Sequence, residues 1–170
     1  MKKILLSAAL LMGVVFSSQA QEGGKEGFHF GAGIDVALPV GDLGDIGGVG
    51  FGPKVQGEYR VSENFGAGLS VAYTFFTKKN EISTSALPVL AHGRYYTSGG
   101  FFAGVGLGVT SNTQKFDFGG TSVSGTTSAF TYEPHIGYEL PSIQLSLGYY
   151  GSSKNGGTLA YLGLSGVYVF

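Results

Sequence analysis

The sequence predicts an all-β fold, an eight-stranded antiparallel up-and-down transmembrane β-barrel. Polar and apolar residues alternate with a period of two along most of residues 28–170, and no segment there sustains a helical period. The chain is poor in charge for a soluble domain, with 12% charged residues against about 25% on average. It ends on an aromatic strand, residues 158–170. These features indicate a barrel whose outer surface meets lipid.

The predicted strands are separated by turn residues, and their connections alternate in length. We expect strands at 28–40, 49–60, 65–76, 85–96, 101–111, 128–140, 143–151 and 158–170. Short connections are expected at 61–64, 97–100 and 141–142, and longer ones at 41–48, 77–84, 112–127 and 152–157. Short turns at one end and longer loops at the other are typical of transmembrane barrels.

One face of these strands is predicted to point toward lipid, because it carries no charged residue. At the short-turn end it presents Phe28, Phe30, Tyr59, Phe65, Tyr95, Phe101, Tyr138, Tyr168 and Phe170. At the long-loop end it presents Phe51, Tyr73, Phe75, Phe130, Tyr132 and Tyr149. The positions between are aliphatic, glycine or proline, so the pattern matches two interfacial girdles around an apolar band. A soluble ligand-binding barrel with this face inward would fill its cavity with aromatic rings.

The opposite face is predicted to line a polar lumen. Its charged residues and histidines are candidates for an interior network, namely Asp35, Lys54, Glu58, Arg60, His92, Arg94, Glu133, His135 and Glu139. Glycines on this face leave room for long side chains from the opposite wall. Side chains alone fill a barrel of eight strands, and desolvated charges must be paired. We therefore expect ion pairs that plug the lumen. A gated pore in which the pairs rearrange is the alternative.

No catalytic site, cofactor or metal ion is expected. Glu133 and His135 lie two residues apart on the lumen face, but nothing in the sequence places His92 beside them. Hydrogen bonding inside the barrel is therefore the preferred role. The outward face carries no serine or histidine of the kind a lipid-modifying hydrolase needs, so an enzyme is the third hypothesis. The Gly-x-Gly runs precede no helix and do not fit a dinucleotide-binding loop.

Residues 1–20 are predicted to be a cleaved signal peptide, which leaves residues 21–170 as one outer-membrane β-barrel domain. Two lysines precede a mostly apolar run, and Ser18-Gln-Ala20 supplies small residues for cleavage. The run is shorter than the roughly 20 residues that a membrane-spanning helix needs. The chain has no cysteine, which excludes disulfides and thiolate metal sites. No basic patch suggests nucleic-acid binding.

The leader, the eight strands and the terminal Gly166-Val-Tyr168-Val-Phe170 resemble the small outer-membrane barrels of the OmpA-barrel and OmpX type. The glycine-rich strands that begin at Phe28 and Phe101 look more like the porin-like "outer membrane protein β-barrel domain" family. The resemblance is architectural and covers residues 21–170. It implies a bacterial outer-membrane location, with periplasmic termini and extracellular long loops. In such proteins an aromatic last strand, here with Tyr168 and Phe170, implies recognition by the barrel-assembly machinery.

We therefore expect a monomeric outer-membrane protein with a structural or surface-interaction role, and as runner-up a narrow, gated porin-like channel for small solutes. The largest connection, 112–127, is expected to be a flexible solvated loop, or else an adhesive surface. Outer-membrane lipid, including lipopolysaccharide, is the expected surrounding partner. Lys78 and Lys79 are weak candidates for contacts with lipopolysaccharide phosphates.

Three prolines fall inside predicted strands. Pro53, Pro88 and Pro134 each lack the N–H that a ladder needs, and a closed barrel has no edge to accommodate them. We expect β-bulges at these positions, or strands that begin later than predicted. Regular ladders through all three would count against the assigned registers.

Overall fold

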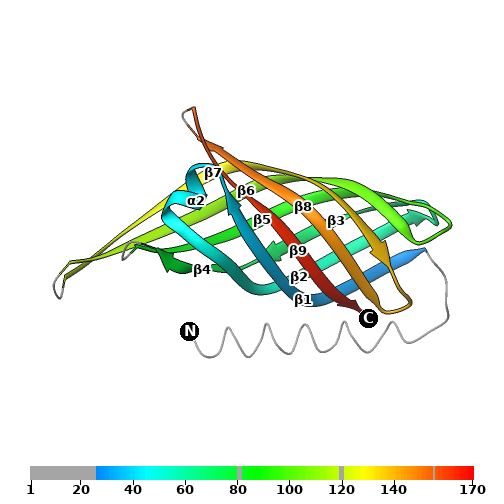
Figure 1. Cartoon of the computed structure of the whole chain (residues 1–170). Helices are drawn as coiled ribbons and strands as arrows, with labels where there is room; N and C mark the ends of the chain where they lie inside the picture. Colours follow the sequence, from blue (N-terminus) through cyan, green and yellow to red (C-terminus); the bar gives the residue numbers. More distant parts are fainter. Residues whose placement is uncertain (1–25, 80–81, 119–120, 155) are drawn as a thin grey trace, which may run out of the picture.

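The computed structural model describes residues 26–79, 82–118, 121–154 and 156–170, and the predicted signal peptide lies outside them. The elements of this part of the chain are β1 (Gly27–Val40), α2 (Asp42–Ile46), β2 (Gly47–Ser62), β3 (Phe65–Ala72), β4 (Thr74–Lys79), β5 (Ile82–Tyr96), β6 (Phe101–Phe118), β7 (Thr121–Glu139), β8 (Ile143–Lys154) and β9 (Gly157–Val169). Neighbouring strands are antiparallel, and β1 pairs with β2 on one side and β9 on the other. The sheet therefore closes into a barrel (Figure 1).

The barrel wall has eight members, as predicted, because β3 and β4 form one continuous run. They are separated only at Tyr73, and β2 pairs with both in a single register, with Lys54 opposite Ala72 and Phe51 opposite Phe75. The N–H of Tyr73 donates to the carbonyl of Pro53 across this gap, at 2.9 Å. Among the described residues, no helix is both long and apolar enough to cross a membrane.

The two ends of the barrel differ. The C-terminus and the short turns lie at one end, and the β6–β7 hairpin projects far beyond the other (Figure 1). This hairpin corrects the prediction of a loop at 112–127. Its strands pair without a register shift from Asn112 opposite Thr127 to Phe118 opposite Thr121, and β5 joins them through Ile82 opposite Phe116. The alternating Ser and Thr residues suit a solvated ladder, and cross-strand hydroxyl pairs support it.

The predicted faces match the observed ones. Outward residues such as Ile34, Leu69 and Phe101 are more than 60% exposed, whereas the inward Glu58 and Arg94 are at most 4% exposed. A one-residue slip in any strand would exchange these sets. The alternation in the sequence therefore determines which side chains enter the lumen.

The expectation of bulges at the prolines is wrong. Pro53, Pro88 and Pro134 keep regular partners on one side, which are Ile34, Thr110 and Val105. On the other side, the pairing of β7 with β8 skips Pro134, and the pairing of β5 with β3 and β4 skips Pro88. The missing N–H is thus accommodated by a one-sided gap, and the registers keep the predicted faces. The register shifts lie nearer the strand ends, as between Arg60 and Ser62.

Candidate functional site

The lumen is the site that the sequence singled out, and its centre is the carboxylate of Glu58 on β2. It accepts hydrogen bonds from Arg60 Nε at 3.1 Å, Arg94 Nη1 at 3.2 Å and Tyr96 Oη at 2.7 Å. All four side chains are at most 4% exposed. A carboxylate that receives three donors in a water-poor interior is satisfied only while those donors stay in place.

Arg60 carries the network to the short-turn end of the lumen. Its Nη2 donates to both carboxylate oxygens of Glu139, at 2.8 and 2.7 Å, and its guanidinium lies 4.0 Å from the ring centre of Tyr96. Glu139 is 24% exposed at the side chain, so this pair borders solvent. A planar guanidinium can bridge two carboxylates and stack on a ring at once, which a lysine cannot do.

Arg94 joins the remaining walls of the lumen. It donates to Gln56 Oε1 at 3.0 Å, to Gln144 Oε1 at 3.2 Å and to His135 Nε2 at 3.1 Å. Gln56 in turn donates to Gln144 at 2.7 Å. Contacts from β2, β5, β7 and β8 therefore meet at one guanidinium. The two glutamines are not among the charged residues and histidines that the sequence singled out, and the structure makes them bridging members of the network.

A second, smaller group lies between this network and the long-loop end. Lys54 Nζ donates to Tyr150 Oη and to Ser165 Oγ, both at 3.0 Å. Ser165 Oγ donates to Asp35, which is fully buried. The predicted lumen charges thus fall into two groups, one around Glu58 and one around Lys54 and Asp35.

The candidate Glu133, His135 and His92 constellation is only loosely assembled. The rings of His92 and His135 lie 6.5 Å apart, and His135 Nδ1 is 3.7 Å from Glu133 Oε2. His92 Nε2 lies 3.3 Å from Glu58 Oε2, without the alignment of a hydrogen bond. In the ranges that the structure describes, no three His, Asp or Glu side chains are grouped as metal ligands would be.

Glycines on the lumen face make space for this network. A Cβ added to Gly66 would approach Glu58 Oε1 to 2.6 Å, and one added to Gly104 would approach His135 Nε2 to 2.6 Å. By contrast, a Cβ on the outward Gly93 would meet no atom within 4 Å. The glycines opposite the charged side chains are therefore part of the packing.

The long-loop half of the lumen contains a buried apolar cluster, which the sequence analysis missed. A buried cluster is formed there by Ala37, Leu43, Phe76, Ala86, Leu90, Tyr150 and Tyr161. The rings of Tyr150 and Tyr161 stack at 4.5 Å, and Phe76 meets Tyr161 edge-on at 5.7 Å. Leu43 on α2 is 2% exposed, so the helix contributes a buried side chain to this cluster. The available signal was the inward phase of Phe76, Tyr150 and Tyr161 in their strands.

Two hollows mark the mouths of the lumen. Arg60, Tyr96 and Glu139 line one of about 510 Å³ at the short-turn end. Asp42, Asn112 and Lys154 line one of about 400 Å³ at the long-loop end. Between them lie the charged network and the apolar cluster.

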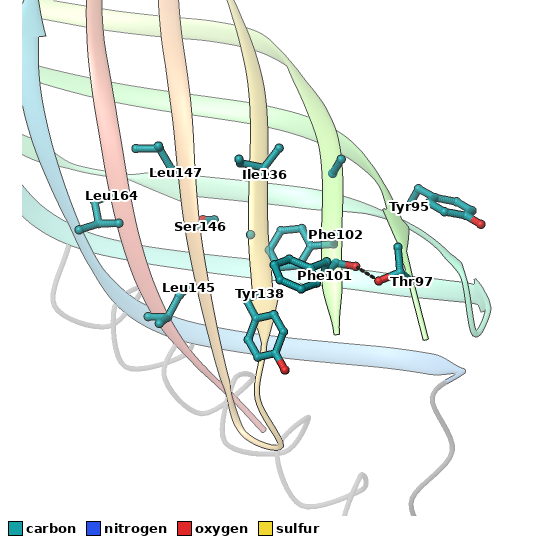
Figure 2. Close-up of a pocket in the computed structure, with 12 residues that line it drawn as sticks. Tyr95, Thr97, Phe101, Phe102, Ile136, Tyr138, Leu145, Ser146, Leu147 and Leu164 are labelled. Carbon is teal, nitrogen blue, oxygen red and sulfur yellow. Dashed lines mark hydrogen bonds between the residues drawn. The ribbon is translucent and has the colours of Figure 1, made fainter. Parts of the chain in front are cut away.

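The outward wall carries an apolar groove near the short-turn end, shown in Figure 2. It has a volume of about 530 Å³, and its lining includes Tyr95, Phe101, Ile136, Tyr138 and Leu145. The predicted assembly-signal residues Tyr168 and Phe170 lie outside the lumen, more than half exposed, with ring centres 5.3 Å apart. They belong to the aromatic girdle at this end.

Comparisons with known proteins agree with this architecture. The family model described as "Outer membrane protein beta-barrel domain" matches residues 7–163. The chain resembles Ail, the attachment invasion locus protein of Yersinia pestis, with a TM-score of 0.66 and 18% identity over 85% of this chain and 99% of that chain. No curated protein sequence matches the chain.

Two further solved structures have the same fold. The N-terminal β-barrel domain of Pseudomonas aeruginosa OprF gives a TM-score of 0.64 and 10% identity over 85% of this chain and 98% of that chain. Neisserial surface protein A gives a TM-score of 0.57 and 18% identity over 87% of this chain and 98% of that chain. At such identities the likeness lies in the fold.

Proposed function

The chain belongs to the outer membrane protein beta-barrel domain family, and from this premise we propose that it acts through its surface, with a lumen closed to solutes. It is a transmembrane β-barrel of the bacterial outer membrane. The closed lumen and the surface role are our inference from the arrangement of the side chains.

The observation that supports the proposal is that two different groups of buried side chains lie one after the other along the lumen. The network around Glu58 and Arg94 spans it with hydrogen bonds from several strands. The cluster around Leu43 and Tyr161 places buried apolar side chains in the long-loop half. A solute would have to displace buried side chains in both groups.

Planar-bilayer recording of the refolded protein tests this closure. We expect no steady single-channel current from the native sequence, with a porin refolded in the same way as positive control. The double variant Glu58→Ala with Leu43→Ala removes one member of each group and is expected to conduct. Steady current through the native barrel would favour the narrow, gated channel instead.

The orientation we propose has periplasmic termini and extracellular long connections. It is supported by the short turns and C-terminus at one end and the projecting β6–β7 hairpin at the other. The chain has no cysteine, so the single variant Gly125→Cys on that hairpin gives a clean label site. An impermeant maleimide should label it on intact cells. Labelling that appears only after the outer membrane is opened would reverse the orientation.

The projecting hairpin is the surface we propose for interaction. It presents hydroxyl pairs such as Ser111 with Ser128 and Thr113 with Thr126, at 3.2 and 3.0 Å. The names of the attachment invasion locus protein and of Neisserial surface protein A support a role at the cell surface. We further propose a monomer that binds no nucleic acid, lies among outer-membrane lipids including lipopolysaccharide, and is recognised by the barrel-assembly machinery through its last strand.

We assign no enzymatic activity to the barrel. Release of fatty acid from lipid A by the purified protein would overturn this assignment.

A further inference from the structure

A second hollow on the outward wall lies at the long-loop end and differs in chemistry from the groove in Figure 2. It has a volume of about 520 Å³ and lies across β2, β4, β5 and β6. Its lining includes Phe51, Tyr73, Phe75, Lys78, Ser85 and Lys115. We name it the lysine-flanked pocket.

Aromatic rings form the membrane-side part of this pocket. Tyr73 and Phe75 meet edge-on with ring centres 4.5 Å apart, and Phe51 pairs with Phe75 across the strands. Phe51 is 59% exposed and Phe75 is 48% exposed. These residues belong to the girdle at the long-loop end, which places the pocket at the height of the membrane interface.

Hydroxyl groups lie next to the rings in this pocket. The register sets Ser85 opposite Thr113 and Ser83 opposite Lys115, so a polar row runs along β5 and β6. Tyr73 Oη donates to Ser85 Oγ at 3.3 Å and links the rings to this row. The wall therefore changes from apolar to hydroxyl-rich within one pocket.

Two exposed lysines complete the lining. Lys78 lies on β4 and Lys115 on β6, so they approach the pocket from different strands. No lysine or arginine lines the apolar groove at the short-turn end. The two outward hollows therefore differ in charge, because only the one at the long-loop end is lined by lysines.

We propose that the lysine-flanked pocket binds the phosphorylated headgroup of a saccharolipid in the outer leaflet. The ammonium groups would donate charge-assisted hydrogen bonds to phosphate. The hydroxyl row suits sugar hydroxyls, and the aromatic faces suit the sugar ring and the first methylenes of the acyl chains. The leaflet named here rests on the orientation proposed above, whereas the binding chemistry does not.

The test measures binding in neutral detergent micelles, where orientation has no influence. The refolded protein is titrated with bis-phosphorylated lipid A, and its unfolding midpoint is followed by circular dichroism, since a ligand that binds the folded state raises that midpoint. The double variant Lys78→Ala with Lys115→Ala should bind about tenfold more weakly, a difference of the size expected for lost charge-assisted contacts. Raising the salt concentration should weaken binding to the native protein.

The controls separate this site from general attraction to lipid. Lys154→Ala removes an exposed lysine outside the pocket and should bind like the native protein. The double variant Lys78→Arg with Lys115→Arg should retain binding. Dephosphorylated lipid A, phosphatidylglycerol and inorganic phosphate should each stabilise the protein far less.

Several outcomes would overturn the proposal. Equal loss of binding in Lys154→Ala, or equal binding of dephosphorylated lipid A, would show that the pocket is not a phosphate site. Stabilisation by inorganic phosphate alone would indicate a free anion instead of a lipid, and equal stabilisation by phosphatidylglycerol would indicate a phospholipid. If the proposed orientation is wrong, the labelling of Gly125→Cys will show it independently of these binding measurements.

Discussion

The two halves of the lumen contain different kinds of buried side chains. The short-turn half contains charged side chains held by directional contacts, with Glu58 accepting from three donors. The long-loop half contains a buried cluster of aliphatic and aromatic side chains that includes Leu43 and Tyr161. The first half depends on each partner being present, whereas the second depends on filled volume.

This difference predicts different responses to mutation. Removing one member of a buried ionic network leaves the others desolvated and unpaired. Removing atoms from an apolar cluster costs the lost burial plus the cavity, and neighbours can partly collapse into it. The charged half should therefore be the more sensitive to single substitutions.

The largest effect is expected for Glu58→Ala. Arg60 and Arg94 would lose a buried carboxylate, and the free energy of unfolding should fall by about 3–5 kcal/mol. Chemical unfolding in detergent micelles measures this. Asp45→Asn, an exposed change on α2, is the control and should be neutral. A cost below that of every apolar substitution would show that the network does not brace the wall.

Arg94→Ala should also lower the unfolding temperature, by less than Glu58→Ala. Glu58 would keep Arg60 and Tyr96 as donors, while Gln56 and His135 would lose one donor each. Thermal unfolding of the two variants side by side gives the order. A fully neutral Arg94→Ala would count against a bracing role for the charged half.

For the apolar half, Leu43→Ala should cost about 2–3 kcal/mol, the low end for a buried leucine. The short helix α2 can shift toward the cavity, which is why the low end is expected. The same unfolding measurement applies, with Asp45→Asn again as control because it lies on the same helix. A larger cost than for Glu58→Ala would reverse the ranking of the two halves.

A smaller loss of unfolding free energy is expected when a glycine that faces the lumen is replaced, and an outward glycine provides the comparison. Gly104→Ala would place a Cβ 2.5 Å from the carbonyl oxygen of Gly93 and 2.6 Å from His135, and should destabilise by about 1–3 kcal/mol through overpacking. Gly93→Ala, on the outward side, meets no atom within 4 Å and should be close to neutral. Equal costs would mean that strand propensity, not lumen packing, dominates.

The smallest effect on stability is expected from shortening the β6–β7 hairpin. Replacing residues 114–125 by an Asn-Gly turn keeps the Thr113–Thr126 pair and leaves both halves of the lumen intact. The unfolding free energy should then change by no more than about 0.5 kcal/mol, as for most surface changes. A large loss would show that the projecting hairpin, and not the lumen alone, stabilises the barrel.

The sequence predicts the closed barrel and the charged half of the lumen well, because a period of two assigns each residue to a face. Glu58, Arg60 and Arg94 could be placed inside from alternation alone. Their partners could not, because the register between distant strands decides whether Arg94 meets Gln144 or another acceptor. The inward positions of Tyr150 and Phe76 could also have been predicted, since both residues occupy the inward phase of their strands.

Other features of the structure could not be predicted from the alternation of polar and apolar residues. The five-residue helix α2 is too short for a periodic signal, and its burial depends on the cluster beneath it. The serines and threonines of residues 112–127 suit a loop and a solvated ladder equally well, so only pairing with β5 and β7 decides between them. The prolines suggested bulges because each lacks an N–H. The one-sided gaps that accommodate them depend on pairing between strands, which the sequence alone does not show.

The pairing of β1 with β9 has a consequence for how the chain reaches its native state. Gly31 lies opposite Val169, and Phe170 N–H donates to the carbonyl of Phe30 at 2.8 Å, so the first and last strands meet only after all others are synthesised. Until then the sheet has two open edges, which can pair with other chains. Such long-range closure is slow. Pairing of β1 with β9 therefore removes both open edges at once, and a chain in which it has not formed remains exposed to aggregation.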